Sequence, residues 1–291
     1  CTFFDLSPHG RLVHGRVPEK PEDPATGGFM ATIFGDTSGT LSGTNSGRRQ
    51  TILGIAYQTN QIVGDANAII QNARGGNDIL TGGSASPYNS IYGDANRMAG
   101  FAVGGADRIR GGADSQRNDL VGDAWTMVSQ AVGGNDEIRG GANTQINFVL
   151  GDAYSMSGLT QGGNDRLAGG NGSQTNTLVG DAYTLSELAQ GGHDRITGGA
   201  HSAQNDIVGD AWLMRDATKG GNDSIVGGDY AQFNFLLGDA YTLSDAARGG
   251  NDELKGGAHA DTNWMFGDAY QMLGKAVGGN DILTGGADSR S

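Results

Sequence analysis

A Gly-Asp pair recurs every 29 residues along this chain, eight times without a change of spacing. A fixed period of about 20–50 residues indicates a solenoid or a propeller, in which each repeat packs on its neighbours. This periodicity constrains the fold more than any local motif does. The aspartates of these pairs form a column that we call the Gly-Asp ladder: Asp65, Asp94, Asp123, Asp152, Asp181, Asp210, Asp239 and Asp268.

A second aspartate column has the same period and closes the motif Gly-Gly-Asn-Asp or a close variant of it. We call it the Gly-Gly-Asn-Asp ladder: Asp78, Asp107, Asp136, Asp165, Asp194, Asp223, Asp252 and Asp281. An asparagine column accompanies the two: Asn60, Asn89, Asn118, Asn147, Asn176, Asn205, Asn234 and Asn263. An aliphatic residue or methionine stands two positions after each of these aspartates and asparagines. Short apolar segments bounded by glycine pairs are typical of strands joined by sharp turns.

The repeat therefore predicts an all-β chain. We expect a right-handed parallel β-helix, a β-solenoid similar to a β-roll, with about eight rungs of 29 residues. Equivalent residues would stack at the inter-strand spacing of about 4.8 Å, and the aliphatic columns would form a continuous interior. Residues 181–190 are expected to form a strand and a turn, not a helix, because equivalent segments carry Gly100, Gly158 and Gly274.

The first part of the chain lacks the repeat. We expect residues 1–45 to form an N-terminal arm and a degenerate capping rung, and residues 46–291 to form the repeats. Arg49 stands where the Gly-Gly-Asn-Asp ladder would have another aspartate. Cys1 is either a lipidated residue or a point of truncation. Unpaired rung ends favour strand addition, so head-to-tail self-association into a filament is one expectation, and a chain cut within its repeat is the alternative.

Two stacked columns of carboxylates require neutralisation. Unit charges about 5 Å apart repel by roughly 3–4 kcal/mol at an effective dielectric constant of 20. No column of Lys or Arg accompanies either ladder, and the basic residues are interpreted as scattered, as at Arg108, Arg139, Arg166, Arg195 and Lys255. Calcium accepts 6–8 oxygen ligands in flexible geometry, and glycine corners leave backbone carbonyls accessible. Calcium is therefore the predicted counter-ion.

The segment Gly163-Asn164-Asp165-Arg166-Leu167-Ala168-Gly169-Gly170 resembles the nonapeptide of the hemolysin-type calcium-binding repeats, the RTX proteins. The resemblance covers about residues 60–291 and implies calcium between successive turns, held by the Gly-Gly-Asn-Asp ladder and glycine carbonyls. This repeat is longer than the two nonapeptides of an RTX turn, and its second half carries asparagine in place of aspartate. That asparagine column is expected to pair amides along the stack. The Gly-Asp ladder would bind calcium or, alternatively, cap backbone N–H groups.

Composition narrows the partners. The formal charge is −13, but seventeen of the 32 acidic residues belong to the two ladders when Asp36 is included, which leaves 15 acids against 19 bases. Nucleic-acid binding is not expected, because no basic stripe is evident in the sequence. No apolar run of 18 residues predicts a membrane span.

An aromatic column occupies six successive rungs. It consists of Trp125, Tyr154, Tyr183, Trp212, Tyr241 and Tyr270. We expect it to pack as a stacked core ladder, and an exposed aromatic face of a carbohydrate-binding module, with cell-surface glycans as partners, is the alternative.

The expected function is structural or adhesive. Catalysis requires a singular constellation of groups, and the repeat shows none, so an enzyme is not expected; a fragment of a polysaccharide lyase or epimerase remains the alternative. Calcium sites of millimolar affinity fill outside the cell. The sequence thus predicts a secreted, calcium-stabilised solenoid that serves as a surface-layer, matrix, adhesin or filament subunit.

Overall fold

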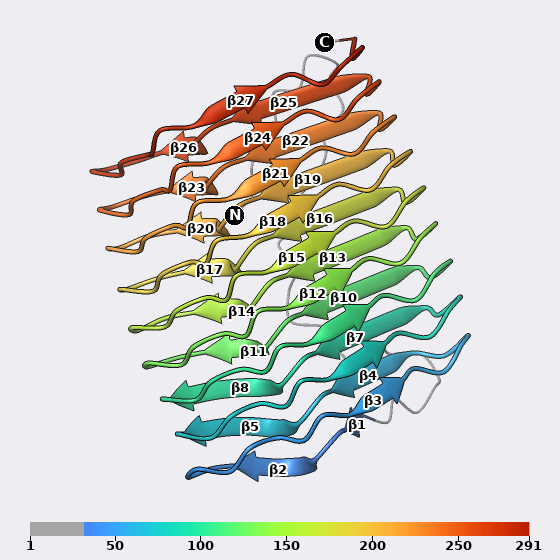
Figure 1. Ribbon diagram of the computed structural model, residues 1–291, viewed down its shortest axis with the longest axis vertical. Coiled ribbons are helices and arrows are strands. Elements are labelled where there is room, and N and C mark those ends of the chain that lie inside the picture. Colours follow the sequence, from blue (N-terminus) through green and yellow to red (C-terminus); the bar gives the residue numbers. More distant parts are fainter. Residues whose placement is uncertain (1–31, 291) are drawn as a thin grey trace.

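The computed structural model describes residues 32–290 as a β-solenoid of three parallel sheets with nine strands each (Figure 1). Each rung adds one strand to every sheet, and no helix occurs among the described residues. The expected N-terminal arm lies in residues 1–31, outside the described residues. No helix among residues 32–290 is long and apolar enough to cross a membrane.

The strands alternate between the sheets in chain order. Sheet 1 consists of β1 (Thr32–Phe34), β4 (Asn60–Val63), β7 (Tyr88–Tyr92), β10 (Arg117–Val121), β13 (Ile146–Leu150), β16 (Thr175–Val179), β19 (Gln204–Val208), β22 (Phe233–Leu237) and β25 (Thr262–Phe266). Sheet 2 consists of β2 (Thr37–Leu41), β5 (Ala66–Gln71), β8 (Ala95–Gly100), β11 (Ala124–Met127), β14 (Ala153–Met156), β17 (Ala182–Leu185), β20 (Ala211–Met214), β23 (Ala240–Leu243) and β26 (Ala269–Met272). Sheet 3 consists of β3 (Thr51–Leu53), β6 (Ile79–Thr81), β9 (Arg108–Arg110), β12 (Glu137–Arg139), β15 (Arg166–Ala168), β18 (Arg195–Thr197), β21 (Ser224–Val226), β24 (Glu253–Lys255) and β27 (Ile282–Thr284).

The register follows the sequence period. Leu120 pairs with Val149, which pairs with Leu178, so equivalent positions of successive repeats are stacked directly. The predicted solenoid is confirmed. The count of about eight rungs becomes nine strands per sheet because the degenerate first rung, β1 to β3, joins all three sheets. The segment after Asp181 is the strand β17 followed by a turn at Glu187, as predicted.

The interior contains two separate apolar clusters. One lies between sheets 1 and 3 and stacks aliphatic residues such as Leu178 and Ile196. The other lines sheet 2 and combines alanines with larger residues, such as Ala182 with Leu185. Because side chains alternate across a strand, the residues between these inward positions face the opposite side. They form a third cluster in the angle where sheets 1 and 2 meet.

An asparagine ladder secures the turn between sheets 3 and 1. The Asn147 amide nitrogen donates to the Asn176 side-chain oxygen at 2.9 Å, and the Asn118 amide donates to Asn147 at 2.9 Å. The Asn147 oxygen also accepts the Gly141 N–H at 2.9 Å. Amide pairing along the stack, predicted from the sequence, is therefore confirmed.

Candidate cation-binding ladders

Both aspartate ladders point into the interior at two corners of each rung. Asp123 lies between β10 and β11, and Asp136 directly precedes β12. Between 0% and 3% of each side chain is exposed in fourteen of these aspartates, whereas Asp268 and Asp281 of the last rung are partly exposed. The buried set is Asp65, Asp78, Asp94, Asp107, Asp123, Asp136, Asp152, Asp165, Asp181, Asp194, Asp210, Asp223, Asp239 and Asp252.

One carboxylate oxygen of each ladder aspartate accepts a backbone hydrogen bond. In the Gly-Asp ladder, Asp152 Oδ1 accepts the N–H of Gly163 in the following glycine pair at 2.7 Å. In the Gly-Gly-Asn-Asp ladder, Asp165 Oδ1 accepts the N–H of Asp136, one rung earlier, at 2.7 Å. The Gly-Asp ladder therefore does cap backbone N–H groups, which is one of the two roles expected from the sequence. The capping contact occupies only part of each carboxylate.

The second oxygen is left without a hydrogen bond. Among the described residues, twelve buried carboxylate oxygens lack a donor, and they include Oδ2 of all seven buried members of the Gly-Gly-Asn-Asp ladder. The other five belong to Asp65, Asp152, Asp181, Asp210 and Asp239. A buried, unpaired carboxylate oxygen is costly, so such a row requires protons or cations.

Glycine brings the two ladders and the backbone carbonyls together. A Cβ added to Gly122 would stand 1.7 Å from the carbonyl oxygen of Gly151 and 2.1 Å from Oδ2 of Asp136. The Gly-Asp corner therefore has no space for a side chain, because the next rung's carbonyl and the neighbouring ladder's carboxylate both contact its Cα. Two oxygens that cannot donate to each other converge at this point, which is the environment of a cation or of a shared proton.

The electrostatics of the ladders are those of buried like charges. Burial raises the pKa of Asp78 to about 7, and the negative charge of Asp65 contributes to this rise. Burial, followed by the charge of Asp252, raises the pKa of Asp239 to about 8. In the middle of the rod, burial raises the pKa of Asp165 well above its ordinary value, and the charge of Asp152 adds to the effect. No Lys or Arg is buried among the described residues to offset these charges.

These residues fit a hard cation by ligand type and by charge. The free oxygens of the two ladders and the carbonyl oxygens of the Gly-Asp glycines would hold it, and its chemistry there would be neutralisation of carboxylates. One divalent ion per rung would balance two aspartates. No group of three or more His, Cys, Asp or Glu side chains in residues 32–290 is arranged to hold a metal alone. Carbonyl oxygens or water would therefore complete any coordination shell.

The aromatic column is stacked and half-buried. Trp125 and Tyr154 lie with ring centroids 4.2 Å apart and planes 7° from parallel, and Trp212 and Tyr241 are 4.9 Å apart and 1° from parallel. These rings pack against the cluster in the angle between sheets 1 and 2, which includes Val179. The predicted aromatic packing is found on the outer side of this angle and not in the interior. Since the ring faces lie against one another, they are not free to stack on sugars.

Sequence reasoning missed a basic surface. The arginines interpreted as scattered stand on both sides of the inward aliphatic residue of each sheet 3 strand, so they share the outer face of that sheet. They are Arg108, Arg110, Arg139, Arg166 and Arg195. The period of two within each three-residue strand was the signal that would have revealed them. The interpretation of these residues as scattered was therefore wrong.

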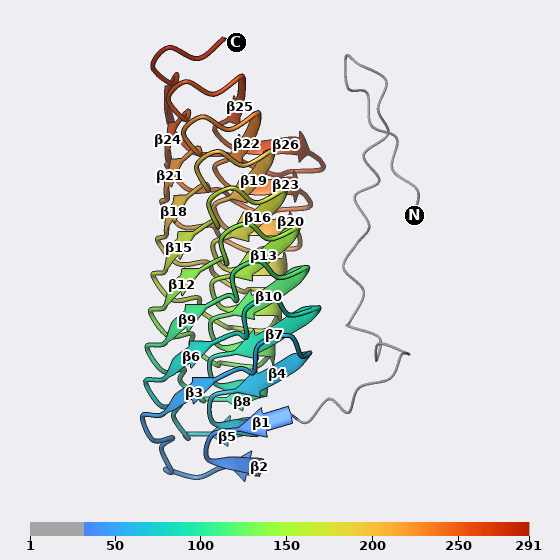
Figure 2. The ribbon, with the colours of Figure 1, turned by 90° about the vertical axis from the view of Figure 1, so that its right-hand side faces the viewer.

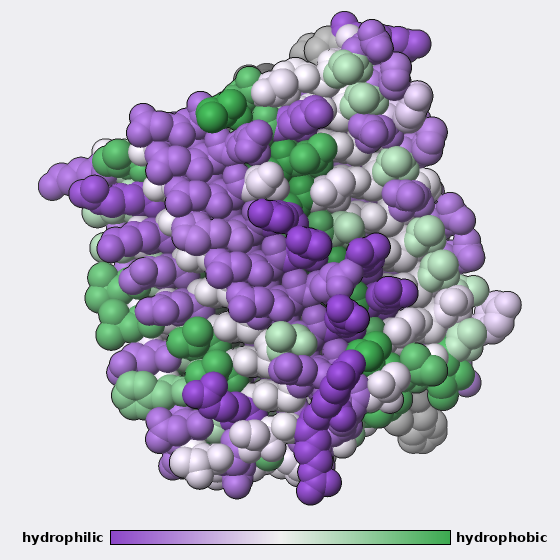
Figure 3. Space-filling view, in the orientation of Figure 1, coloured by the Kyte–Doolittle hydropathy of each residue, from purple (hydrophilic) through white to green (hydrophobic). Residues whose placement is uncertain are grey.

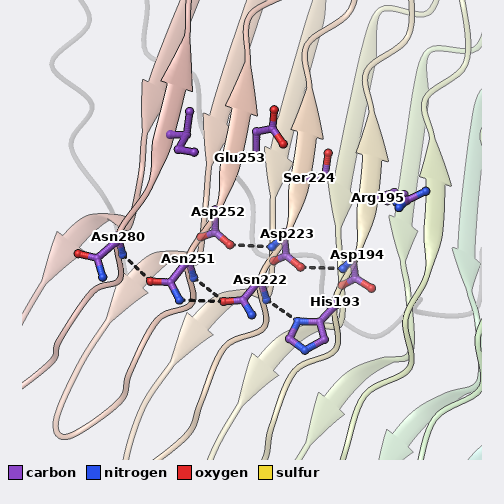
Figure 4. A pocket seen from close by; sticks show the side chains of 11 residues that line it. His193, Asp194, Arg195, Asn222, Asp223, Ser224, Asn251, Asp252, Glu253 and Asn280 are labelled. Atoms are coloured by element: carbon purple, nitrogen blue, oxygen red, sulfur yellow. Dashed lines mark hydrogen bonds between the residues drawn. The ribbon is translucent and has the colours of Figure 1, made fainter.

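A shallow groove runs beside this face (Figure 4). One row of its lining contains His193, Asn222, Asn251 and Asn280, and the next row out contains Arg195, Ser224 and Glu253. His193 was expected to be merely solvated, but its Nδ1 accepts the N–H of Asn222 at 2.6 Å. It therefore takes the place of an asparagine oxygen in the exposed row.

No family model matches this chain, and neither a curated protein nor a solved structure resembles it significantly. The class of the protein thus rests on its fold, which is a parallel β-solenoid with rungs of 29 residues.

Proposed function

We propose that this protein is a calcium-stabilised structural rod of the RTX-like kind, with a role outside the cell as a surface-layer, matrix, adhesin or filament subunit. One observation carries the proposal. Fourteen aspartates are buried in two adjoining ladders, twelve of their oxygens lack a hydrogen-bond donor, and no buried Lys or Arg accompanies them within residues 32–290. Divalent cations would remove this charge and join neighbouring rungs, so that binding energy becomes folding energy.

Calcium is favoured over other ions by the ligand chemistry. The free ligands are carboxylate and carbonyl oxygens, which suit calcium and magnesium, and no thiolate is present in the ladders. Magnesium demands near-ideal octahedral geometry and retains its waters, which the sealed interior disfavours. An extracellular location follows from the same proposal, since weak calcium sites fill at the calcium concentrations found outside cells.

A structural role is favoured by the uniformity of the rod. The two ladders and the asparagine ladder repeat with little change from rung to rung, so no single rung stands out as a catalytic centre. At one end, the outer edge of β27 is unpaired within residues 32–290, and at the other end so is that of β3. Edge-to-edge addition of a second copy would continue all three sheets, which supports the proposal of head-to-tail assembly.

The proposal is tested by a calcium titration of protein stripped with EDTA. Far-UV circular dichroism and hydrodynamic size should report a cooperative transition to a compact β-form, and equilibrium dialysis with elemental analysis should find about seven calcium ions per chain, half the number of buried aspartates. Magnesium at the same concentration should be a weaker inducer.

A matched pair of variants makes the test specific. Asp165→Asn, within the buried ladder, should lower the number of bound calcium ions, whereas Asp245→Asn, at an exposed turn, should leave it unchanged. Fully folded protein in EDTA at neutral pH, with no bound calcium at millimolar concentration, would overturn the proposal.

A further inference from the structure

The outer face of sheet 3 carries a strip of positive charge on a protein whose formal charge is −13. In the pairing register, Arg108, Glu137, Arg166 and Arg195 form one column, and Arg110 and Arg139 begin a parallel column. All five arginines are exposed. We call these five arginines the arginine strip. Strong hydrophilicity is visible over the central strands of sheet 3 in Figure 3, and Figure 2 shows the same sheet edge-on.

Most of the charge of the strip is not used within the protein. Glu137 is its single acidic member, and it lies 3.3 Å from Arg108 and 2.8 Å from Arg139. Within residues 32–290, Arg110, Arg166 and Arg195 have no carboxylate at ion-pair distance. The strip is bounded by uncharged side chains, Ile79 and Thr81 on β6 and Ser224 and Val226 on β21.

A row of hydrogen-bond donors lies next to the strip. Asn135 and Asn164 each use their side-chain oxygen to accept a backbone N–H of the next rung, at 2.7 Å in both cases. Their amide N–H groups are therefore the parts left for a ligand. His193 Nδ1 accepts from the Asn222 N–H, so a neutral His193 carries its proton on Nε2. Arginine and these groups offer donors only, apart from Glu137, which is the chemistry of an anion-binding surface.

We propose that the arginine strip and the adjoining row bind an extended anionic glycan, carboxylated or sulfated. The strip is two side chains wide, about 7 Å, and four rungs long, about 15 Å, which suits one extended chain. Its repeat of about 4.8 Å is close to the length of one pyranose residue. The basic residues are all arginine, whose planar fork binds carboxylate and sulfate groups with paired hydrogen bonds.

Two other polyanion geometries fit less well. A single-stranded nucleic acid is bound through aromatic side chains on which its bases stack, and sheet 3 presents no Phe, Tyr or Trp in β9, β12, β15 or β18. A duplex is wider than the strip and would bring its phosphates towards the remainder of an acidic protein. The proposal does not depend on which cation the ladders bind.

Fluorescence anisotropy with short labelled oligosaccharides tests the proposal at one fixed calcium concentration. An oligogalacturonate and a heparin-derived oligosaccharide of equal length are the two anionic probes, and they distinguish carboxylate from sulfate. Binding of either is expected, with affinity that falls steeply as salt rises. A neutral dextran oligosaccharide should not bind. Failure of both anionic probes, or equal binding of dextran or of single-stranded DNA, would overturn the proposal.

Charge-matched double variants locate the surface. Arg166→Gln with Arg195→Gln should weaken binding about tenfold or more, whereas Arg97→Gln with Arg215→Gln, exposed arginines on or beside sheet 2, should change it less than about twofold. Arg166→Lys with Arg195→Lys keeps the charge and loses the planar fork, so an intermediate loss is expected. Circular dichroism confirms that each variant is folded. An equal loss in the two glutamine variants would refute the placement on sheet 3.

Discussion

The substitution Asp78→Asn should have opposite effects on stability with and without calcium. Asp78 is 1% exposed, and its Oδ1 accepts the Gln50 N–H at 2.6 Å while its Oδ2 has no donor among the described residues. Asparagine has nearly the same shape, keeps an oxygen for Gln50, and removes the charge. A Cβ on Gly64 would stand 2.5 Å from Oδ2 and 1.7 Å from the Gly93 carbonyl oxygen, so the new amide would point at an acceptor.

The magnitude follows from the pKa. The pKa of Asp78 rises from 3.8 to about 7 in the folded chain, chiefly because of burial. Folding therefore favours the protonated carboxyl, and unfolding releases its proton between these two pKa values. Stability in the absence of metal is highest below about pH 4 and falls as the pH rises towards 7, by at most about 4 kcal/mol for this group. Asp252, with a pKa of about 7, and Asp239, with a pKa of about 8, add to the fall.

Urea unfolding followed by circular dichroism would measure the effect. In EDTA at pH 8, Asp78→Asn should be more stable than the parent protein, by up to about 4 kcal/mol, and the difference should vanish near pH 4. In calcium the order should reverse, because the variant has lost an anionic ligand. Asp114→Asn, at an exposed turn, is the control and should behave as the parent in both conditions.

The reasoning fails if Asp78→Asn is less stable than the parent in EDTA at pH 8. It also fails if the stability of the parent in EDTA does not fall between pH 5 and pH 8. Either result would mean that the carboxylates are neutralised by something other than protons or cations.

Three further changes test the rest of the fold. Asn147→Ala should cost about 3 kcal/mol or more in urea unfolding, because it leaves the Gly141 N–H and the neighbouring ladder amides without partners; a loss below about 1 kcal/mol would contradict the role of the ladder. Gly122→Ala should prevent folding of the central rungs, as seen by proteolysis, since its Cβ would stand 1.7 Å from the Gly151 carbonyl oxygen, whereas Gly285→Ala, with open space around it, should be tolerated. Deletion of Gly162–Gln190, one full period, should give a rod one rung shorter with the same circular dichroism per residue, whereas deletion of Gly162–Asn176 should disrupt it; equal tolerance of both deletions would argue against stacked rungs.

The sequence by itself determined the architecture. Because every rung stacks on an equivalent rung, one period of 29 residues specifies the register of all three sheets, and each column of the sequence becomes a line along the rod. The asparagine ladder followed from the same logic, since identical amides one rung apart can only meet one another. Asp181 and Asp194 belong to their columns for the same reason, and their spacing alone is enough to assign them.

Only the tertiary structure decided how the columns of one rung lie relative to one another. It placed the two aspartate ladders side by side, with the Asp165 pKa raised in part by the charge of Asp152. It also placed the aromatic column outside the interior and gathered Arg110, Arg166 and Arg195 on one outer face. The physical reason is that a repeat encodes contacts along the rod axis, whereas contacts across a rung depend on the bend angles at its glycine corners. Those angles arise from packing between the sheets and leave no periodic signature in the sequence.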